Sequence, residues 1–375
     1  GVVRGGVVPG RGADGARGVG PPRGRAWGAA AGAGGGGGAA AGVGRGVAGG
    51  GGEGAQGRGG RVGCGGISEL HLRAYQKAGY RVVGLCSRTE ANARKRQAEF
   101  FPQARVYADY RALLDDGDIE VVDIATHPLE RVDIIEAALR AGKHVLVEKP
   151  VGLQAAQIDP LIALRDETGL VAAEAFMIAH HPQWARTRHL IADGAIGDLR
   201  HVDGVFCYNN PDLTNVRFDP AKGGGSLPDI GVYTIGSTRL ATGQEPLEIT
   251  HADIDYLNGV DVTARVSARF DGFTAHWVTA MNVHNTQRMT FLGSEGRIHL
   301  SAPFNAATYG EAQLELHQSD GSARLERWPD YAQYVTQVEA FCASVRTRAP
   351  YAWSLEDARG TQRVIDAVYA AAVPR

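Results

Sequence analysis

The chain has 375 residues, of which 44% are hydrophobic and 21% charged, which is typical of a globular protein with room for two domains. A formal net charge of −2 without a basic block gives no reason to expect a nucleic-acid partner, and the apolar runs are too short for a membrane span. The four cysteines (Cys64, Cys86, Cys207 and Cys342) form no CxxC pair, which argues against a zinc site or a disulfide framework and favours the cytoplasm.

Residues 1–60 differ sharply in composition from the rest of the chain. Of the 52 glycines, 27 fall in this segment, together with seven arginines and only two acids, Asp14 and Glu53. Its apolar residues follow neither a helical nor a strand period, so it cannot bury enough surface to offset the entropy of ordering its glycines. We therefore expect a disordered extension. A start read in the wrong frame of GC-rich coding sequence explains it better than a targeting signal.

From Arg61 onward, short strands alternate with helices. The expected elements are a glycine turn at residues 63–66, a helix from Ile67 with Leu70, Ala74 and Tyr75 on one face, strand Arg81–Cys86, helix Glu90–Phe100, helix Asp109–Leu114, strand Val121–Ala125, helix Leu129–Ala141 and strand His144–Val147. Repeated units of this kind predict an α/β fold, with a doubly wound parallel sheet of the Rossmann type over residues 61–176.

The first strand of that sheet is its weak point. Residues 56–61 read Gln-Gly-Arg-Gly-Gly-Arg, and only Val62 is apolar. A central parallel strand is normally a continuous apolar run, so we expect a strand that forms poorly and leaves a hole in the core.

After Phe176 the pattern changes to period 2. Helices are expected at Gln183–Asp193, Asp229–Leu240, Tyr331–Arg346 and Ser354–Ala372, and strands at Val202–Tyr208, Val260–Phe270, Thr274–Met281, Arg288–Leu292, Arg297–Leu300 and Gln313–His317. These elements predict an α+β domain for substrate binding and oligomerisation over residues 177–353, built on a large open, mostly antiparallel sheet. The last helix, 354–372, is expected to pack back on the first domain.

Two features indicate a dinucleotide site. Gly63, Gly65 and Gly66 would let backbone N–H groups approach a pyrophosphate, although Ser68 stands where GxGxxG has its third glycine. Ser87 and Arg88 follow the second strand, where NAD enzymes place an acid, and an arginine there suits the 2′-phosphate of NADP. The alternative for Arg88 is a solvated surface residue.

Two further motifs indicate catalysis. Strand His144–Val147 runs into Glu148-Lys149-Pro150 at the carboxyl edge of the sheet, where ligands bind in such folds. Residues 223–233 read Gly-Gly-Gly-Ser-Leu-Pro-Asp-Ile-Gly-Val-Tyr, with Asp229 and Tyr233 four apart on one helical face. The alternatives are a surface salt bridge for Lys149, an N-cap for Asp229 and a packed aromatic for Tyr233.

Together with Glu174-Ala175-Phe176-Met177 and His181-Pro182-Gln183, these motifs resemble the Gfo/Idh/MocA oxidoreductase family over residues 61–375. The chain is most similar to the branch with dimeric dihydrodiol dehydrogenases and NADP-dependent D-xylose dehydrogenases. The resemblance implies that Tyr233 is the acid–base residue, Lys149 its helper and Asp229 the residue that orients the sugar. It also implies cofactor contacts from Gly63, Gly65, Gly66, Ile67, Ser87, Arg88, Thr126, Glu148, Lys149 and Pro150.

One position departs from the family pattern. Relatives commonly have a histidine where this chain has Arg131, which puts the neighbouring nicotinamide contacts in doubt. The adjacent pair His180-His181 has no third ligand at a sensible spacing, so no metal is expected.

The predicted function is hydride transfer between NADP(H) and a sugar or related polyhydroxylated compound, with Tyr233 as the base and its pKa lowered by Lys149. NAD is the less favoured cofactor. A homodimer or larger homo-oligomer is expected. The alternatives are an NAD-dependent inositol or polyol dehydrogenase and a non-catalytic NADP-sensing regulator on the same fold.

Overall fold

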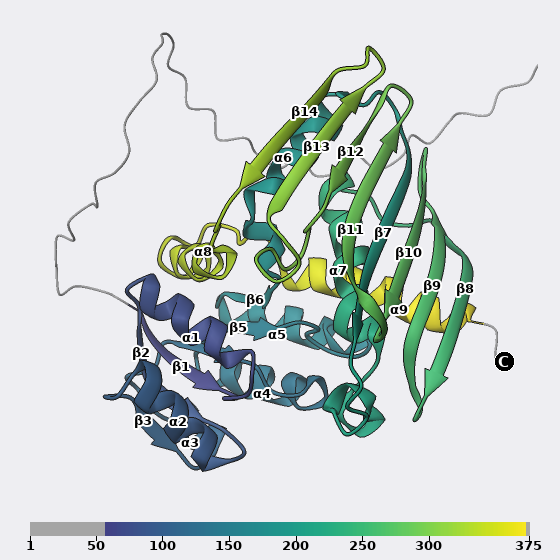
Figure 1. Ribbon diagram of the computed structural model, residues 1–375. Coiled ribbons are helices and arrows are strands. Elements are labelled where there is room, and N and C mark those ends of the chain that lie inside the picture. Colours follow the sequence, from purple (N-terminus) through teal and green to yellow (C-terminus); the bar gives the residue numbers. More distant parts are fainter. Residues whose placement is uncertain (1–56, 373–375) are drawn as a thin grey trace, which may run out of the picture. The chain divides into compact units, whose positions relative to one another are not determined.

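A computed structural model describes residues 57–372 and places them in two sheets with helices (Figure 1). A six-stranded sheet has the order β3-β2-β1-β4-β5-β6, and an eight-stranded sheet has the order β14-β13-β12-β11-β7-β10-β9-β8. All neighbours in the six-stranded sheet are parallel. The predicted architecture, a Rossmann sheet followed by a large, mostly antiparallel sheet, is confirmed.

The first half contains β1 (Arg58–Val62), α1 (Ser68–Lys77), β2 (Arg81–Cys86), α2 (Glu90–Phe100), β3 (Arg105–Tyr107), α3 (Tyr110–Leu114), β4 (Val121–Ile124), α4 (Pro128–Arg140), β5 (His144–Glu148), η1 (Ala155–Gln157), α5 (Asp159–Thr168) and β6 (Ala172–Ala175). The expected disordered extension reached residue 60, but its last three residues, Arg58, Gly59 and Gly60, belong to β1. The expectation for residues 1–56 lies outside the described residues.

β1 forms at the centre of the sheet, so the prediction of a poorly formed strand is wrong. Gly60 pairs with Gly84 of β2, and a Cβ at Gly60 would come within 2.8 Å of Leu113 and 3.1 Å of Ile119. These two apolar side chains, from α3 and from the segment before β4, occupy the space that apolar residues of β1 would fill. The core therefore has no hole at this position.

The second half contains η2 (Met177–His180), α6 (Pro182–Ala192), β7 (Leu199–Asn209), η3 (Val216–Phe218), η4 (Pro220–Lys222), the π-helical turn η5 (Leu227–Gly231), α7 (Val232–Thr242), β8 (Glu248–Leu257), β9 (Val260–Arg269), β10 (Thr274–Ala280), β11 (Asn282–Gly293), β12 (Gly296–Leu300), β13 (Ala312–Gln318), β14 (Ala323–Trp328), α8 (Gln333–Thr347) and α9 (Leu355–Ala371). β10 and β7 pair in parallel, whereas the other pairs are antiparallel. Helices α6, α7 and α9 lie along one face of this sheet (Figure 1).

α9 belongs to both hydrophobic cores. Its first turn contributes Leu355 and Ala358 to the core of the parallel sheet, and its later turns contribute Val364, Ile365 and Val368 to the core of the large sheet. Ser354 caps the helix, and its hydroxyl accepts from the backbone N–H of Asp357. None of the helices between residues 57 and 372 combines the length and hydropathy needed to cross a bilayer.

Candidate active site

The glycine turn between β1 and α1 is open on one side. A Cβ at Gly65 or Gly66 would meet no atom within 4 Å, whereas one at Gly63 would collide with the carbonyl of Ala125 at 2.5 Å. Gly63 also has a φ of 97°, in the region that favours glycine. Ile67 is the N-cap of α1, so the helix N-terminus directly follows the open turn. This cradle fits a dinucleotide pyrophosphate.

The other predicted cofactor residues lie at the same edge of the sheet. Ser87 and Arg88 follow β2, and Thr126 follows β4; both strands pair with β1 in parallel, so the three residues leave the sheet at its carboxyl edge. Arg88 is exposed, and its charge acts on His127 beside Thr126. The residues present therefore fit a dinucleotide with a phosphate near its ribose.

Glu148, Lys149 and Pro150 form the turn that leaves β5, and Arg131 of α4 braces it. The buried Arg131 guanidinium donates to the carbonyl of Glu148 at 2.9 Å, to that of Pro150 at 2.5 Å, and twice to that of Thr126 at 2.8 and 3.0 Å. Burial lowers the pKa of Arg131 to about 10. Arg131 therefore ties the Thr126 loop to the lysine turn through backbone carbonyls.

Lys149 meets Asp229 and Tyr233, which come from the second half of the chain. Its ammonium Nζ lies 3.1 Å from Asp229 Oδ1 and 5.0 Å from the centre of the Tyr233 ring, and it also donates to the Asp229 carbonyl. Asp229 lies in the π-helical turn η5 and Tyr233 in the first turn of α7, rather than both in one regular α-helix. Turns of this kind are frequent at functional sites.

Asp229 has two more partners that the sequence did not single out. Tyr208 of β7 donates its hydroxyl to Asp229 Oδ2 at 2.7 Å, and Arg217 of η3 donates through Nε at 2.7 Å. Although burial opposes ionisation, the Lys149 and Arg217 charges hold the pKa of Asp229 well below its usual range. Asp229 is therefore an ionised acceptor with three polar side chains around one carboxylate.

Tyr233 is enclosed by aromatic rings and is only 6% exposed. Its ring packs on those of Phe176, Phe206 and Phe304, with centres 5.5–5.6 Å apart, and its hydroxyl donates to the sulfur of Met177 at 3.5 Å. Burial raises the pKa of Tyr233 well above its usual value. The expectation that Lys149 lowers this pKa is wrong for this structure, because the ammonium lies over the ring and burial outweighs it.

Glu174, at the end of β6, is a buried acid behind this aromatic cluster. Its Oε2 accepts from the indole N–H of Trp353 at 2.8 Å, and the Trp353 ring stacks on Phe176 at 4.5 Å. Burial raises the pKa of Glu174 to about 7. Glu174 therefore changes charge near neutral pH, next to the residues that support Tyr233.

His180 and His181 face different surroundings. The His180 ring packs on Tyr351, whereas His181 caps α6 and packs on Tyr331. Within residues 57–372 no group of three or more His, Cys, Asp or Glu side chains could hold a metal ion.

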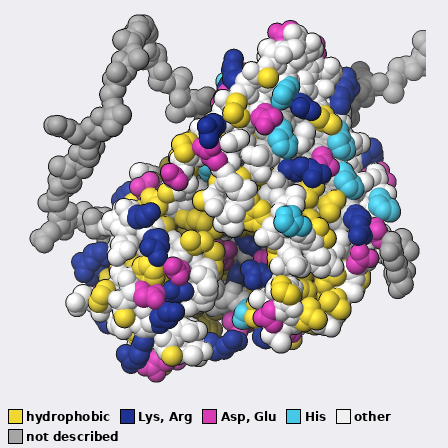
Figure 2. All heavy atoms as spheres, in the orientation of Figure 1, with side chains coloured by type: hydrophobic (Ala, Val, Ile, Leu, Met, Phe, Trp, Pro, Cys, Tyr) yellow, Lys and Arg dark blue, Asp and Glu magenta, His cyan; other side chains and the backbone are white. Residues whose placement is uncertain are grey.

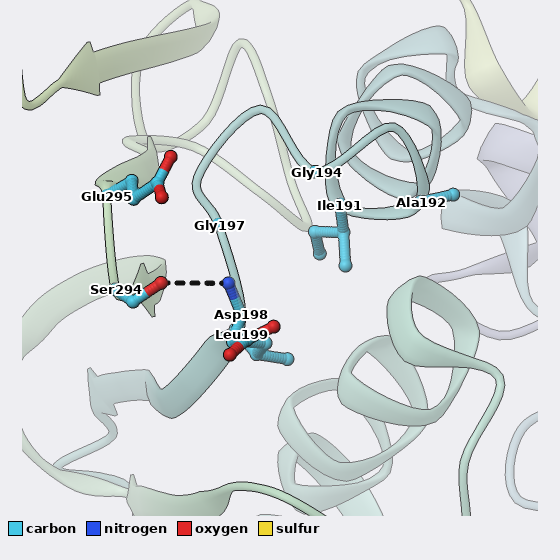
Figure 3. Close-up of a pocket in the computed structure, with 8 residues that line it drawn as sticks. All are labelled: Ile191, Ala192, Gly194, Gly197, Asp198, Leu199, Ser294 and Glu295. Carbon is cyan, nitrogen blue, oxygen red and sulfur yellow. Dashed lines mark hydrogen bonds between the residues drawn. The ribbon is translucent and has the colours of Figure 1, made fainter.

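The surface is hollowed between the two halves, with acidic and basic side chains in the hollow (Figure 2). A separate, open depression of about 560 Å³ lies between the end of α6 and the β11–β12 turn (Figure 3). It is lined by Ile191, Ala192, Gly194, Gly197, Asp198, Leu199, Ser294 and Glu295, and the Ser294 hydroxyl accepts from the Asp198 N–H at 3.0 Å. None of the predicted site residues lines it.

Comparisons with known proteins agree with this fold. Residues 58–176 match a family model described as "Oxidoreductase family, NAD-binding Rossmann fold", and residues 184–299 match one described as "GFO/IDH/MocA C-terminal domain". Together the two models cover well over half of the chain.

Two relatives and one solved structure illustrate the similarity. A dTDP-3,4-didehydro-2,6-dideoxy-alpha-D-glucose 3-reductase of Streptomyces violaceoruber is 33% identical over 296 residues, which cover 76% of this chain and 85% of the relative. D-xylose 1-dehydrogenase (NADP(+)) 2 of Haloferax volcanii is 30% identical over 303 residues, 80% of this chain and 92% of the relative. KijD10, a 3-ketoreductase from Actinomadura kijaniata in complex with NADP and TDP-benzene, is 28% identical with a TM-score of 0.78, over 85% of this chain and 98% of that one.

Proposed function

The chain belongs to the Gfo/Idh/MocA family of oxidoreductases, and from this membership we propose that it transfers a hydride between NADP(H) and a hydroxyl- or keto-bearing carbon of a sugar. One observation carries the proposal. An ammonium from the first half, Lys149, and a carboxylate and a phenol from the second half, Asp229 and Tyr233, meet beside the carboxyl edge of the parallel sheet. This edge is where open α/β sheets bind dinucleotides.

Gly63, Gly65, Gly66 and Ile67 would hold the pyrophosphate, with Ser87, Arg88 and Thr126 along the ribose. Glu148, Lys149 and Pro150 would border the nicotinamide. The dinucleotide supplies or accepts the hydride at its nicotinamide ring. The preference for NADP rests on Arg88, and the NADP named with the xylose dehydrogenase and the ketoreductase supports it.

In the direction of reduction, Tyr233 donates its hydroxyl proton to the carbonyl oxygen of the substrate as the hydride reaches carbon. Burial holds the phenol in its protonated form, which is the form this step requires. Lys149, whose ammonium lies 3.1 Å from Asp229, stabilises negative charge that develops on the oxygen. The same residues run the reverse step when an alcohol is oxidised.

A sugar is the proposed substrate because Asp229, Lys149 and Tyr208 offer acceptors and donors that match neighbouring hydroxyl groups. A sugar attached to a nucleoside diphosphate is a second candidate. Arg217 donates to Asp229 through Nε while its side chain is 45% exposed, and a partly exposed guanidinium beside the site suits the diphosphate of such a sugar.

The test is a turnover panel of free aldoses, polyols and dTDP-sugars, each measured with NADP(H) and with NAD(H). Faster turnover of a sugar with NADP(H) supports the proposal. A preference for NAD(H) with inositol or another polyol would contradict the proposal and would favour the alternative, an NAD-dependent inositol or polyol dehydrogenase. Dinucleotide binding without turnover on any substrate would favour a regulatory protein.

The cofactor choice has its own test at Arg88. We expect Arg88→Ala to weaken NADP(H) binding by about tenfold or more and to leave NAD(H) binding nearly unchanged, because only NADP carries the 2′-phosphate. Fluorescence titration of the reduced cofactors measures both affinities. Arg81→Ala, at the opposite end of β2, is the matched control. Equal losses for the two cofactors in Arg88→Ala would contradict the assignment.

Two predictions from the sequence stay predictions. One is self-association into a homodimer or larger homo-oligomer, which sedimentation analysis measures. The other is a cytoplasmic location, which agrees with the four free cysteines.

A further inference from the structure

A line of buried charged side chains runs beneath the lysine turn. Arg61 of β1 contacts Asp123 of β4, Asp123 Oδ2 lies 2.9 Å from His71 Nδ1, and His71 Nε2 lies 2.7 Å from Glu148 Oε1. The side chains of Arg61, His71, Asp123 and Glu148 are between 0% and 7% exposed. Asp123 therefore lies between Arg61 and His71, and Glu148 lies at the end of the line, next to Lys149.

His71 is the centre of this line, although its helical position looked unremarkable in the sequence. The predicted buried face of the helix included Leu70, but Leu70 is 45% exposed and His71 is fully buried instead. Both ring nitrogens of His71 face carboxylate oxygens. A neutral imidazole has only one N–H, so it would leave a lone pair against one carboxylate, whereas the imidazolium donates to both.

The two carboxylates beside His71 favour its charged form. Burial and the Arg61 cation oppose the charge, but Asp123 and Glu148 outweigh them and raise the pKa of His71 to about 9. The Tyr334 ring of α8 lies 5.7 Å away, tilted against the imidazole. In turn, the His71 charge is among the groups that keep the pKa of Glu148 below its usual value against burial.

Glu148 connects this line to Lys149. Its second oxygen, Oε2, accepts from the backbone N–H of Lys149 at 3.0 Å. An ionised Glu148 therefore accepts from His71 on one side and from Lys149 on the other. A protonated Glu148 would lose much of its strength as an acceptor at both contacts.

We propose that His71 is a positioning residue that, as a buried imidazolium, keeps Glu148 ionised and thereby holds the backbone of Lys149 in the geometry required for hydride transfer. The proposal rests on the proposed function for the role of Lys149. The line itself also joins α1, whose N-terminus follows the glycine turn, to the lysine turn. Cofactor binding and the position of Lys149 are thus linked through one side chain.

The first test measures the charge of His71 without any turnover. In the ligand-free protein with labelled histidine rings, NMR should show one imidazole that stays protonated up to about pH 9 and disappears from the spectrum in His71→Gln. Asp123→Asn should lower that pKa by about one unit or more, because it removes a carboxylate in direct contact. A His71 ring that is neutral at pH 7 would overturn the proposal, whatever the enzyme's substrate.

The second test uses the pH profile of kcat/KM. In His71→Gln, Glu148 loses a cation, so its pKa rises and the acid limb of the profile, followed from about pH 4 to pH 8, should move up by about one pH unit or more. His144→Gln is the matched control, because His144 is buried at the opposite end of β5 and should leave the limb in place.

A uniform loss at every pH in His71→Gln, with both limbs of the pH profile unmoved, would mean a structural role only and would overturn the proposal.

If His71→Gln does not fold, Asp123→Asn serves in its place. It should move the alkaline limb down by about one pH unit, since the imidazolium then loses its proton earlier. An unmoved alkaline limb in Asp123→Asn would overturn the proposal too. Absence of turnover in the unaltered protein would instead count against the proposed function, and the NMR test would still decide the charge of His71.

Discussion

At the residue scale, the proposed acid–base group lies among carbon and sulfur atoms rather than in water. The Tyr233 ring packs between Phe176 and Phe304, and its hydroxyl donates to the Met177 thioether, a weak acceptor. A phenol with no strong acceptor keeps its proton until a substrate oxygen arrives. This environment suits proton donation to a carbonyl.

Replacing that hydroxyl is the direct test of its role. We expect Tyr233→Phe to lower kcat by about 10²-fold or more, the usual contribution of a positioned acid–base group, with NADPH binding unchanged. Steady-state kinetics and cofactor titration provide the two measurements. Tyr351→Phe, which removes the hydroxyl of another buried tyrosine, should retain most of the activity. Unchanged kcat in Tyr233→Phe would remove the residue from the mechanism.

Glu174 should make the stability of the protein depend on pH. Its folded pKa of about 7 lies above the unfolded value near 4.3, so its contribution to stability is fully present below about pH 4 and is lost as the pH rises to 7. In Glu174→Gln the amide stays neutral and still accepts from Trp353. The variant should therefore gain stability over the unaltered protein by about 1.4 kcal/mol per pH unit between about pH 5 and pH 7. Urea unfolding at several pH values measures the difference, and a constant difference would refute the buried ionisation.

The position of Lys149 could be predicted because it follows β5 at the edge that the ends of parallel strands share. Asp229 and Tyr233 stand together in one short segment, and it is the family resemblance that connects them with Lys149 and implies their roles. Tyr208 and Arg217 were missed because they reach Asp229 from a long strand and a short 3-10 turn, with no spacing that marks either residue. The burial of His71 was missed because the apolar pattern of its helix favoured Leu70.

At the element scale, β1 shows how a strand with only one apolar side chain larger than glycine can occupy a sheet centre. Its Gly60 and the paired Gly84 leave room that Leu113 and Ile119 occupy. The buried Arg61 is compensated by Asp123 on the neighbouring strand. Packing from outside the strand replaces the apolar run that the sequence lacks.

Adding one methyl group to β1 should therefore destabilise the protein at one glycine and not at its neighbour. Gly60→Ala would press a Cβ against Leu113 and Ile119, and we expect a loss of about 1–3 kcal/mol in the free energy of unfolding. Gly59→Ala is the matched control, since a Cβ there meets its nearest atom, the Arg81 carbonyl oxygen, at an ordinary 3.6 Å. Urea denaturation compares the two variants. Equal stability would contradict the packing described for β1.

Most strands with alternating or continuous apolar residues were predicted, because their period survives in the sequence. β8 and β14 were not, since both are edge strands in which few side chains are buried and charged residues interrupt the apolar pattern. β6 was also missed, because Ala-Ala-Glu-Ala carries no strand signal of its own and is fixed by pairing with β5. The parallel pairing of β10 with β7 depends on the chain path and leaves no mark in either strand.

At the scale of the whole molecule, α9 makes the two sheets one unit of stability. It contributes to both cores, and its Asp366 carboxylate accepts from the Ala155 N–H at 2.8 Å, beyond the lysine turn. Loosening this helix removes contacts from both halves at once. We therefore expect residues 57–372 to unfold in a single transition.

Ile365→Ala tests this shared role. The residue is fully buried, so the truncation should cost about 2–5 kcal/mol, and it should lower the stability of both halves together. Hydrogen exchange, measured at increasing urea concentrations, reports the stability of each sheet separately. Two separated transitions, with only the large sheet affected, would show that the halves are independent.

The contact between Lys149 and Asp229 joins groups from the two halves of the chain. A shift of a few ångströms between the halves would break it. Any motion that separates the halves to admit or release a substrate would therefore interrupt the arrangement needed for the reaction. Such a motion would then share control of the pace of each cycle with the chemical step.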